Sequence, residues 1–175
     1  QKTRQLLVKN LAEEELGINA GDVSHSDLWI AFGKGLGLTE GEIISASALP
    51  ETVTTISVFS NLVKHKSFAE ALGVLYAYEQ QVPVIATTKQ HGLQQFYGIN
   101  DQKTLAFFDV HSTIDIKHAK LWEHLLEQYA VSPADQQAVR NNLNEALDAQ
   151  LIFLDGIYRA YVKDVIEESA CLCAN

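Results

Sequence analysis

The chain has 175 residues, of which 47% are hydrophobic and 20% are charged. This size and composition are ordinary for a globular protein with one core, so we expect a single domain over residues 1–175. The formal net charge of −9 argues against nucleic acid and anionic membranes as partners. No apolar run approaches the roughly 20 residues of a bilayer-spanning helix. Because the only cysteines are Cys171 and Cys173 and no signal-peptide pattern is present, we expect a cytoplasmic location.

The beginning of the chain already has a helical pattern. The sequence contains no methionine, and Leu6, Leu7 and Leu11 follow at once without a capping residue before them. We therefore expect either an N-terminally truncated fragment or a chain whose ordered part begins inside a longer sequence. Residues 1–16 form the first predicted helix, which Gly17 can end.

Further helices follow in chain order, each with a local start signal. A helix is predicted over His25–Leu36, with either Ser24 or Ser26 as its N-terminal cap. Thr39 and Glu42 form a capping box, which predicts the start of a short helix. Another helix is predicted from about residue 51 to residue 65, although β-branched side chains lower the helix propensity of this segment.

Three long helices are predicted for the remainder of the chain, from residue 67 onward. Ser67–Leu93 is one apolar helix in which Pro83 should cause a kink near Glu79. The other two helices are Asp101–Tyr129 and Ser132–Glu168. No stretch alternates with period two, so we expect an all-α bundle without repeats.

The most informative motif is His111-Ser-Thr-Ile-Asp115-Ile-Lys-His118. On a helix, positions i, i+4 and i+7 share one face, so two imidazoles and one carboxylate point the same way. Both side-chain types bind first-row metals. The alternative is a solvated polar face, but Phe107, Phe108, Ile114 and Leu121 flank the motif and predict burial. A buried charge needs a partner, and a metal ion is a good one.

Other helices offer further ligands. Glu79 follows Leu72, Leu75 and Tyr76 at helical spacing, although a Glu near a kink can instead bind freed backbone groups. His25 taken alone is more often a cap or a packed imidazole, and an acidic run such as Glu13–Glu15 is usually solvated. Glu14, however, continues the Leu7–Leu11 stripe and should point inward. The full set suits two iron or manganese ions better than tetrahedral zinc, and consists of Glu14, His25, Glu79, His111, Asp115 and His118.

The order Glu…His…Glu…His-x-x-x-Asp-x-x-His on helices resembles the heme-oxygenase-like di-iron oxidases. Within them, the chain is similar to the group that contains the chlamydial proteins associating with death domains and their bacterial relatives. The similar segments are Asn10–Gly17, His25–Trp29, Leu75–Pro83 with Ile85, Ala86 and Lys89, Phe108–Ala119, and the cysteine-bearing tail. The His111–His118 motif and the Tyr-Glu-x-Gln-x-Pro segment are specific, whereas the acidic run is not.

The resemblance implies a heme-oxygenase-like helical bundle and a function. The six residues above match the ligands of a dimetal centre with two iron ions, or one iron and one manganese, and Lys89 matches a lysine implicated in the chemistry. The relatives resemble self-sacrificing synthases that make para-aminobenzoate, a folate precursor, from one of their own tyrosines with dioxygen and an external reductant. We expect the same non-heme oxygenase chemistry and the same two partners here, and a homodimer is left open.

The sequence departs from this pattern in two ways. The loop between Glu14 and His25 is a few residues longer, so Glu15 is an alternative ligand. The first helices of the family, which carry the consumed tyrosine, are absent, and neither Tyr76 nor Tyr78 matches a motif for it. Lys89 also has an ordinary interpretation, because a lysine among threonines and glutamines is by default exposed.

Three functions therefore compete. The first is the dimetal synthase, and the second is a dimetal oxidase or oxygenase acting on another small molecule, because a fold does not fix a function. The third is a death-domain-type binding protein with a structural metal. Cys171 and Cys173 could form a redox pair, bind metal or belong to a flexible tail.

Overall fold

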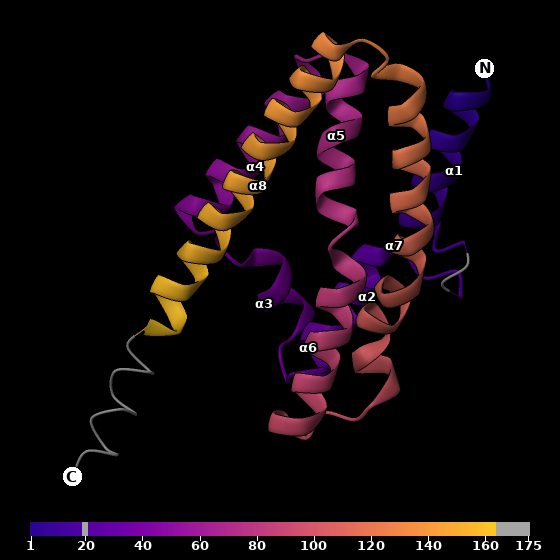
Figure 1. Ribbon diagram of the computed structural model, residues 1–175. Helices are drawn as coiled ribbons and strands as arrows, with labels where there is room; N and C mark the ends of the chain where they lie inside the picture. The colour runs from indigo at the N-terminus through magenta and orange to yellow at the C-terminus, as the bar shows by residue number, and fades with distance from the viewer. Residues whose placement is uncertain (19–20, 164–175) are drawn as a thin grey trace. The chain divides into compact units, whose positions relative to one another are not determined.

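The computed structural model describes residues 1–18 and 21–163, and within these residues the secondary structure consists of helices only. Figure 1 labels the helices along the chain. The prediction of an all-α fold is confirmed. The helices are α1 (Lys2–Leu16), α2 (His25–Gly35), α3 (Glu40–Ser45), α4 (Pro50–Lys64), α5 (Phe68–Glu79), α6 (Val82–Tyr97), α7 (Gln102–Tyr129) and α8 (Pro133–Tyr161).

The predicted helix Ser67–Leu93 is the main error in the predicted elements. The chain instead forms α5 and α6, with a turn at Gln80 and Gln81 between them. Pro83 lies in the first turn of α6, where a residue without a backbone N–H leaves no helical hydrogen bond unmade. Pro83 thus starts a new helix rather than kinking an existing one. At the other end, residues 164–175, with Cys171 and Cys173 and the predicted end of the last helix, lie outside the described residues.

The chain divides into two compact units, each described here by itself. Unit 1 contains Gln1–Ala46 and Glu79–Leu125, and unit 2 contains Ser47–Tyr78 and Leu126–Asn175. In unit 2, α4 runs antiparallel to α8, because Glu51 at the start of α4 pairs with Arg159 near the end of α8. The unit 2 core includes Leu62, Val74 and Ala146.

Unit 1 contains every residue that was predicted to bind metal. Its apolar core is formed by Ala86, Leu105 and Phe108, with Phe32 of α2 packed against it. The approach of α2 to the start of α7 requires a glycine at position 35, because a Cβ there would lie 2.0 Å from Oγ1 of Thr104. These contacts place one end of α2 against α7 and leave its other end, at His25, beside the middle of α7.

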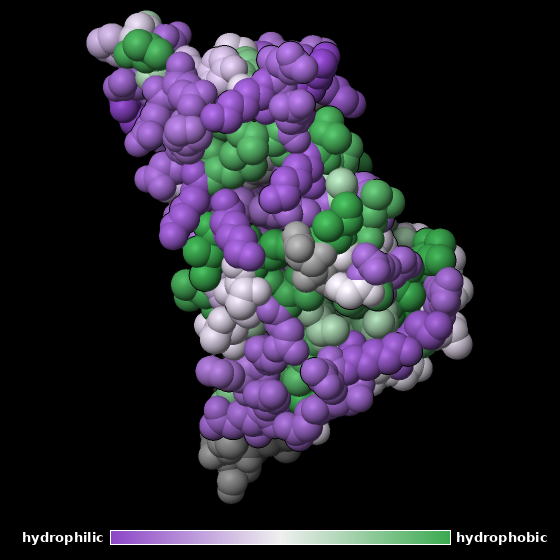
Figure 2. Space-filling model, turned by 90° about the vertical axis from the view of Figure 1, so that its right-hand side faces the viewer, coloured by the Kyte–Doolittle hydropathy of each residue, from purple (hydrophilic) through white to green (hydrophobic). Residues whose placement is uncertain are grey.

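The first helix turns a different face inward than the sequence suggested. Leu11 is 57% exposed, and Val8 and Leu16 are also exposed. The inward face instead follows Asn10, Glu13 and Gly17, and Gly17 ends the helix with a φ of 64°. On the side of the molecule that includes α1, hydrophobic residues accordingly reach the surface among hydrophilic ones (Figure 2). Within residues 1–18 and 21–163, no helix is both long enough and apolar enough to cross a bilayer.

Candidate metal centre

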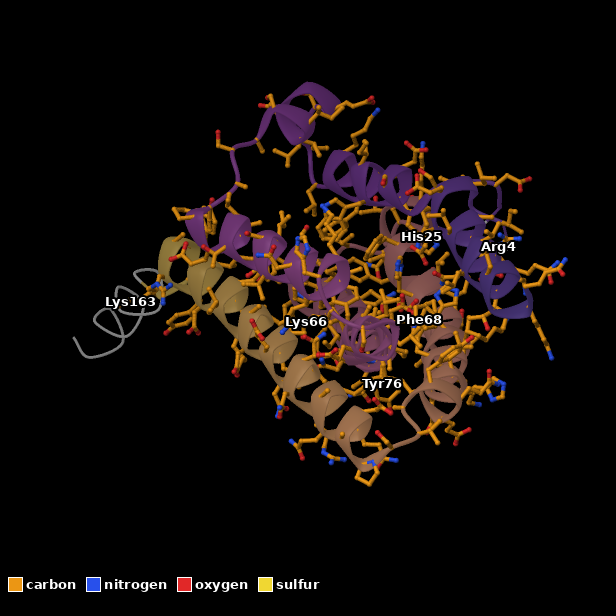
Figure 3. All side chains as sticks on the ribbon, turned by 90° about the horizontal axis from the view of Figure 1, so that it is seen from above. Arg4, His25, Lys66, Phe68, Tyr76 and Lys163 are labelled. Atoms are coloured by element: carbon orange, nitrogen blue, oxygen red, sulfur yellow. The ribbon has the colours of Figure 1, made fainter. Side chains whose placement is uncertain are left out.

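Three helices of unit 1 and the last residue of α5 bring the six predicted ligands into one region. Glu14 comes from α1, His25 from α2, Glu79 from the end of α5, and the remaining three from α7. In the view from above, His25 lies between α2 and α7 (Figure 3). His25, His111, Asp115 and His118 are buried, Glu14 and Glu79 are half-buried, and the alternative ligand Glu15 is exposed.

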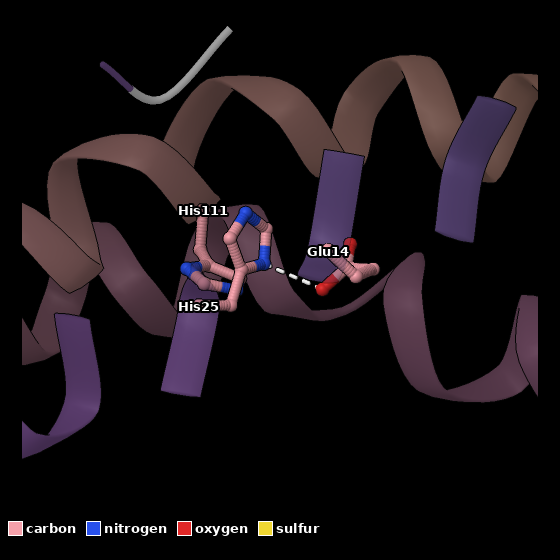
Figure 4. Close-up of side chains that lie close together, drawn as sticks. All are labelled: Glu14, His25 and His111. Carbon is pink, nitrogen blue, oxygen red and sulfur yellow. Dashed lines mark ion pairs between the residues drawn. The ribbon is translucent and has the colours of Figure 1, made fainter. Parts of the chain in front are cut away.

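Glu14, His25 and His111 form a first triad. One potential ligand atom from each of the three residues lies within 4.8 Å of the other two. Oε2 of Glu14 is 2.5 Å from Nδ1 of His25 (Figure 4). The rings of His25 and His111 meet edge to face, with their centroids 4.5 Å apart. Residues from three different helices thus present one carboxylate and two imidazoles to a common point.

Glu14, Asp115 and His118 form a second triad by the same criterion, so Glu14 belongs to both triads. Nδ1 of His118 lies 3.4 Å from Oδ1 of Asp115 and 3.6 Å from Oε1 of Glu14. Glu79 joins this group, because its Oε2 is also 3.6 Å from Nδ1 of His118. Glu14 therefore lies within reach of both groups of potential ligands.

The α7 residues are oriented by their own helix and its packing. Nδ1 of His111 is 2.6 Å from the carbonyl oxygen of Phe107, which can only accept a hydrogen bond. Nδ1 of this ring therefore carries the proton, and Nε2 is left as the possible metal-binding atom. The Phe107 ring also stacks on His111, at a centroid distance of 4.0 Å.

Sequence reasoning missed two residues that contact the candidate ligands. Glu13 is buried, and its Oε2 lies 2.8 Å from Nε2 of His118. Trp122 is also buried, and its indole N–H donates to Oε2 of Glu79. The spacing of Asn10, Glu13 and Gly17 could have indicated Glu13, because these positions share a helix face. Trp122 lies four residues after His118 on α7, a spacing that puts both on one side of the helix.

Burial and the neighbouring charges move the pKa values of three of these groups. Burial raises the pKa of Glu79 to about 7, although the hydrogen bond from Trp122 opposes this shift. For His118, burial alone would lower the pKa, but contacts with Asp115 and Glu13 and the charges of Glu79 and Glu14 raise it to about 9. Burial would raise the pKa of Glu14, but the contact with His25 and the nearby imidazoles lower it below its usual value. Without a metal ion, protons held by Glu79 and His118 therefore partly neutralise the negative charge of the carboxylates in this region.

Lys89, the predicted catalytic residue, lies on α6 with an exposed side chain. It is at the edge of a cavity of about 290 Å³ whose other lining residues are mainly aromatic or aliphatic. These are Trp29, Phe32, Gly92, Leu93, Tyr97 and Phe108. Phe108 is three residues before His111, so the cavity and the first triad adjoin the same segment of α7.

Comparison of the sequence with known proteins identifies the family of the chain. A family model described as iron-containing redox enzyme matches residues 1–151. The chain is 38% identical over 94% of its length to a protein of Nitrosomonas europaea named 4-aminobenzoate synthase. It is 33% identical over 86% of its length to one of the same name from Chlamydia pneumoniae, and it spans 65% of the length of each of these relatives. A pyrroloquinoline-quinone synthase of Bradyrhizobium is 26% identical over 81% of the chain and is covered over 55% of its own length. The resemblance inferred from the motifs is confirmed, and the chain belongs to the family of iron-containing redox enzymes.

Proposed function

We propose that the two triads and Glu79 hold two metal ions, either two iron ions or one iron and one manganese. The observation that carries this proposal is the position of Glu14, which belongs to both triads. The mixed carboxylate and imidazole donors suit these metals. Such a centre supplies activation of dioxygen with electrons from an external reductant.

Three buried ring nitrogens support the proposal independently. Nδ1 and Nε2 of His25 and Nδ1 of His118 lack a hydrogen bond of normal geometry among the described residues. A buried polar atom without a partner costs roughly 1–3 kcal/mol of free energy, and this applies to Nε2 of His25. Nδ1 of His25 lies 2.5 Å from Oε2 of Glu14, and Nδ1 of His118 lies 3.4 Å from Oδ1 of Asp115. Their position beside carboxylate oxygens is consistent with a cation that would bind nitrogen and oxygen together.

We further propose that the whole protein makes 4-aminobenzoate from one of its own tyrosines, as the resemblance implies. The names of the relatives from Nitrosomonas and Chlamydia support 4-aminobenzoate as the product, and the resemblance implies the tyrosine as its source. In this proposal Lys89 supplies a primary amine for nucleophilic or redox chemistry, and the aromatic cavity beside it accommodates the reacting ring.

The proposal is tested with the full-length protein, iron or manganese, a reductant and dioxygen. The protein is produced with ring-labelled tyrosine, so that label in released 4-aminobenzoate identifies the source of the ring. We expect less than one product molecule per chain and a matching mass change on the protein. Lys89→Arg should retain the metals but lose the product, because a guanidinium cannot replace a deprotonatable amine. Lys120→Arg, at an exposed position of α7, is the matched control.

The second candidate function is an ordinary dimetal oxidase, and the aromatic cavity is the observation that favours it. A volume of about 290 Å³ is close to the lower limit of small-molecule sites, which begin near 300 Å³. Repeated turnover of an added aromatic substrate, with unlabelled product and no change in protein mass, would support this function and exclude the self-sacrificing reaction. Metal binding without any oxygen consumption would instead favour a binding protein with a structural metal.

A further inference from the structure

Glu13 stands outside both triads but is tied to one of their members. The residue is 7% exposed, and its Oε2 lies 2.8 Å from Nε2 of His118, which is 105 residues later in the chain. Nζ of Lys9 lies 3.6 Å from Oε1 of the same carboxylate, on the exposed side of α1. Glu13 thus connects α1 to the far side of the His118 ring.

This contact determines which nitrogen of His118 has a free lone pair. A carboxylate can only accept a hydrogen bond, so Nε2 must carry the proton that it donates to Glu13. In a neutral imidazole the lone pair is then on Nδ1, the atom that lies 3.4–3.6 Å from Asp115, Glu14 and Glu79. Nδ1 has no hydrogen-bond partner of its own among the described residues.

The two imidazoles that α7 contributes to the candidate metal centre therefore differ. In His111, Nδ1 is held by the carbonyl of Phe107, which leaves Nε2 for a metal ion. In His118 the assignment is reversed, because Glu13 holds Nε2. Two histidines on one helix face, seven residues apart, would thus bind through opposite ring nitrogens, and a contact from another helix causes the difference.

We propose that Glu13 is a positioning residue, which fixes the tautomer and ring orientation of His118 so that Nδ1 faces the metal centre. This inference rests on the proposed metal centre. A carboxylate that accepts from a metal-binding imidazole also makes the ring a stronger donor, and loss of such a partner typically lowers metal affinity about 10–100-fold.

The first test measures the affinity for Mn²⁺ alone, by competition with a chelator. Glu13→Leu removes the acceptor with little change in volume, and we expect the affinity to fall about 10–100-fold. Glu13→Gln retains an oxygen that can accept from Nε2 and should recover most of the loss. Glu15→Leu makes the same change at an exposed position of the same helix and should match the unmodified protein.

The second test observes the ring directly and does not depend on activity. In the unmodified protein with ¹⁵N-labelled histidine and diamagnetic Zn²⁺, NMR should show His118 with zinc on Nδ1 and a proton on Nε2. Zinc on Nε2 of His118 would overturn the proposal, as would an unchanged affinity in a folded Glu13→Leu protein. If Glu13→Leu does not fold, the NMR spectrum of the unmodified protein and the Mn²⁺ affinity of Glu13→Gln still test the proposed role of Glu13.

Failure of the proposed metal centre gives a different result. In that case His118→Ala would bind Mn²⁺ as tightly as the unmodified protein, and neither Glu13 nor its variants could influence the affinity through this ring. If His118→Ala weakens binding but Glu13→Leu does not, the metal centre stands and only the role of Glu13 is wrong.

Discussion

The indole N–H of Trp122 donates a hydrogen bond to Oε2 of Glu79 at a distance of 2.5 Å, which joins residues 43 positions apart. Trp122 is only 1% exposed, so the bond is buried. The same Glu79 oxygen is 3.6 Å from Nδ1 of His118. Trp122 therefore fixes the carboxylate at the end of α5 next to the second triad.

Loss of the indole donor should change the centre more than the fold. In Trp122→Phe, the pKa of Glu79 should rise further above its usual value, because the hydrogen bond from Trp122 now lowers it. Metal affinity should fall by up to about 100-fold, as for other partners of metal ligands. Mn²⁺ titration measures this change, and Tyr161→Phe, which removes a hydroxyl group from an exposed side chain of α8, is the control. Equal affinities in the two variants would contradict the role of Trp122.

The size of the indole matters separately from its donor. Trp122→Ala leaves a cavity in a fully buried position, and we expect the free energy of unfolding to fall by about 3–5 kcal/mol. Chemical denaturation of the metal-free protein measures the loss. If Trp122→Ala loses less free energy of unfolding than Trp122→Phe does, this part of unit 1 is loosely packed.

Loss of a proposed ligand should remove function without unfolding the chain. Glu79→Ala or His118→Ala should abolish oxygen consumption and reduce bound metal, because in the proposed centre both side chains bind metal and neither belongs to the apolar core. Circular dichroism should show unchanged helix content. His91→Ala replaces an exposed histidine of α6 and should behave as the unmodified protein. An active His118→Ala protein with two equivalents of iron would refute the ligand assignment.

Metal binding should release protons in a pH-dependent way. The pKa values of His118, about 9, and Glu79, about 7, are both raised in the metal-free chain, so each group holds its proton to a higher pH than usual. Metal ions require the deprotonated forms. Apparent affinity should therefore increase as the pH rises from 7 to 9, and proton release on Mn²⁺ addition should fall over the same range. An indicator dye measures the release, and in His118→Ala the part that disappears near pH 9 should be missing.

The close contact between α2 and α7 predicts a stability difference between two glycines. A methyl group at position 35 would lie within 2.0–2.7 Å of three side-chain atoms of Thr104, whereas nothing lies within 4 Å of one at Gly41. Gly35→Ala should lower the free energy of unfolding by about 1–3 kcal/mol through overpacking. Gly41→Ala, in the short helix α3, should be neutral or stabilising by up to about 1 kcal/mol. Thermal unfolding of both variants compares them, and a stabilised Gly35→Ala protein would show that α2 can shift.

Features that depend on neighbouring residues could be predicted from the sequence. The capping box of Thr39 and Glu42 is formed as predicted. His111, Asp115 and His118 are all buried on α7, because the helical period alone puts them on one face. The break between α5 and α6 was missed, because a proline is compatible both with a kink inside one helix and with the start of another.

Features that depend on how helices meet were decided only by the tertiary structure. One residue along a helix turns the side chain by about 100°, so the choice among Glu13, Glu14 and Glu15 follows from the rotation of α1 against α7. The leucine stripe predicted that Glu14 faces inward, and Glu14 does belong to both triads. The same stripe did not indicate that Glu13 is the most buried carboxylate of the acidic run, while Glu15 is exposed. The sequence by itself determined that α7 would present two histidines and an aspartate. Packing decided which carboxylates meet them, because that choice depends on contacts between residues about 100 positions apart.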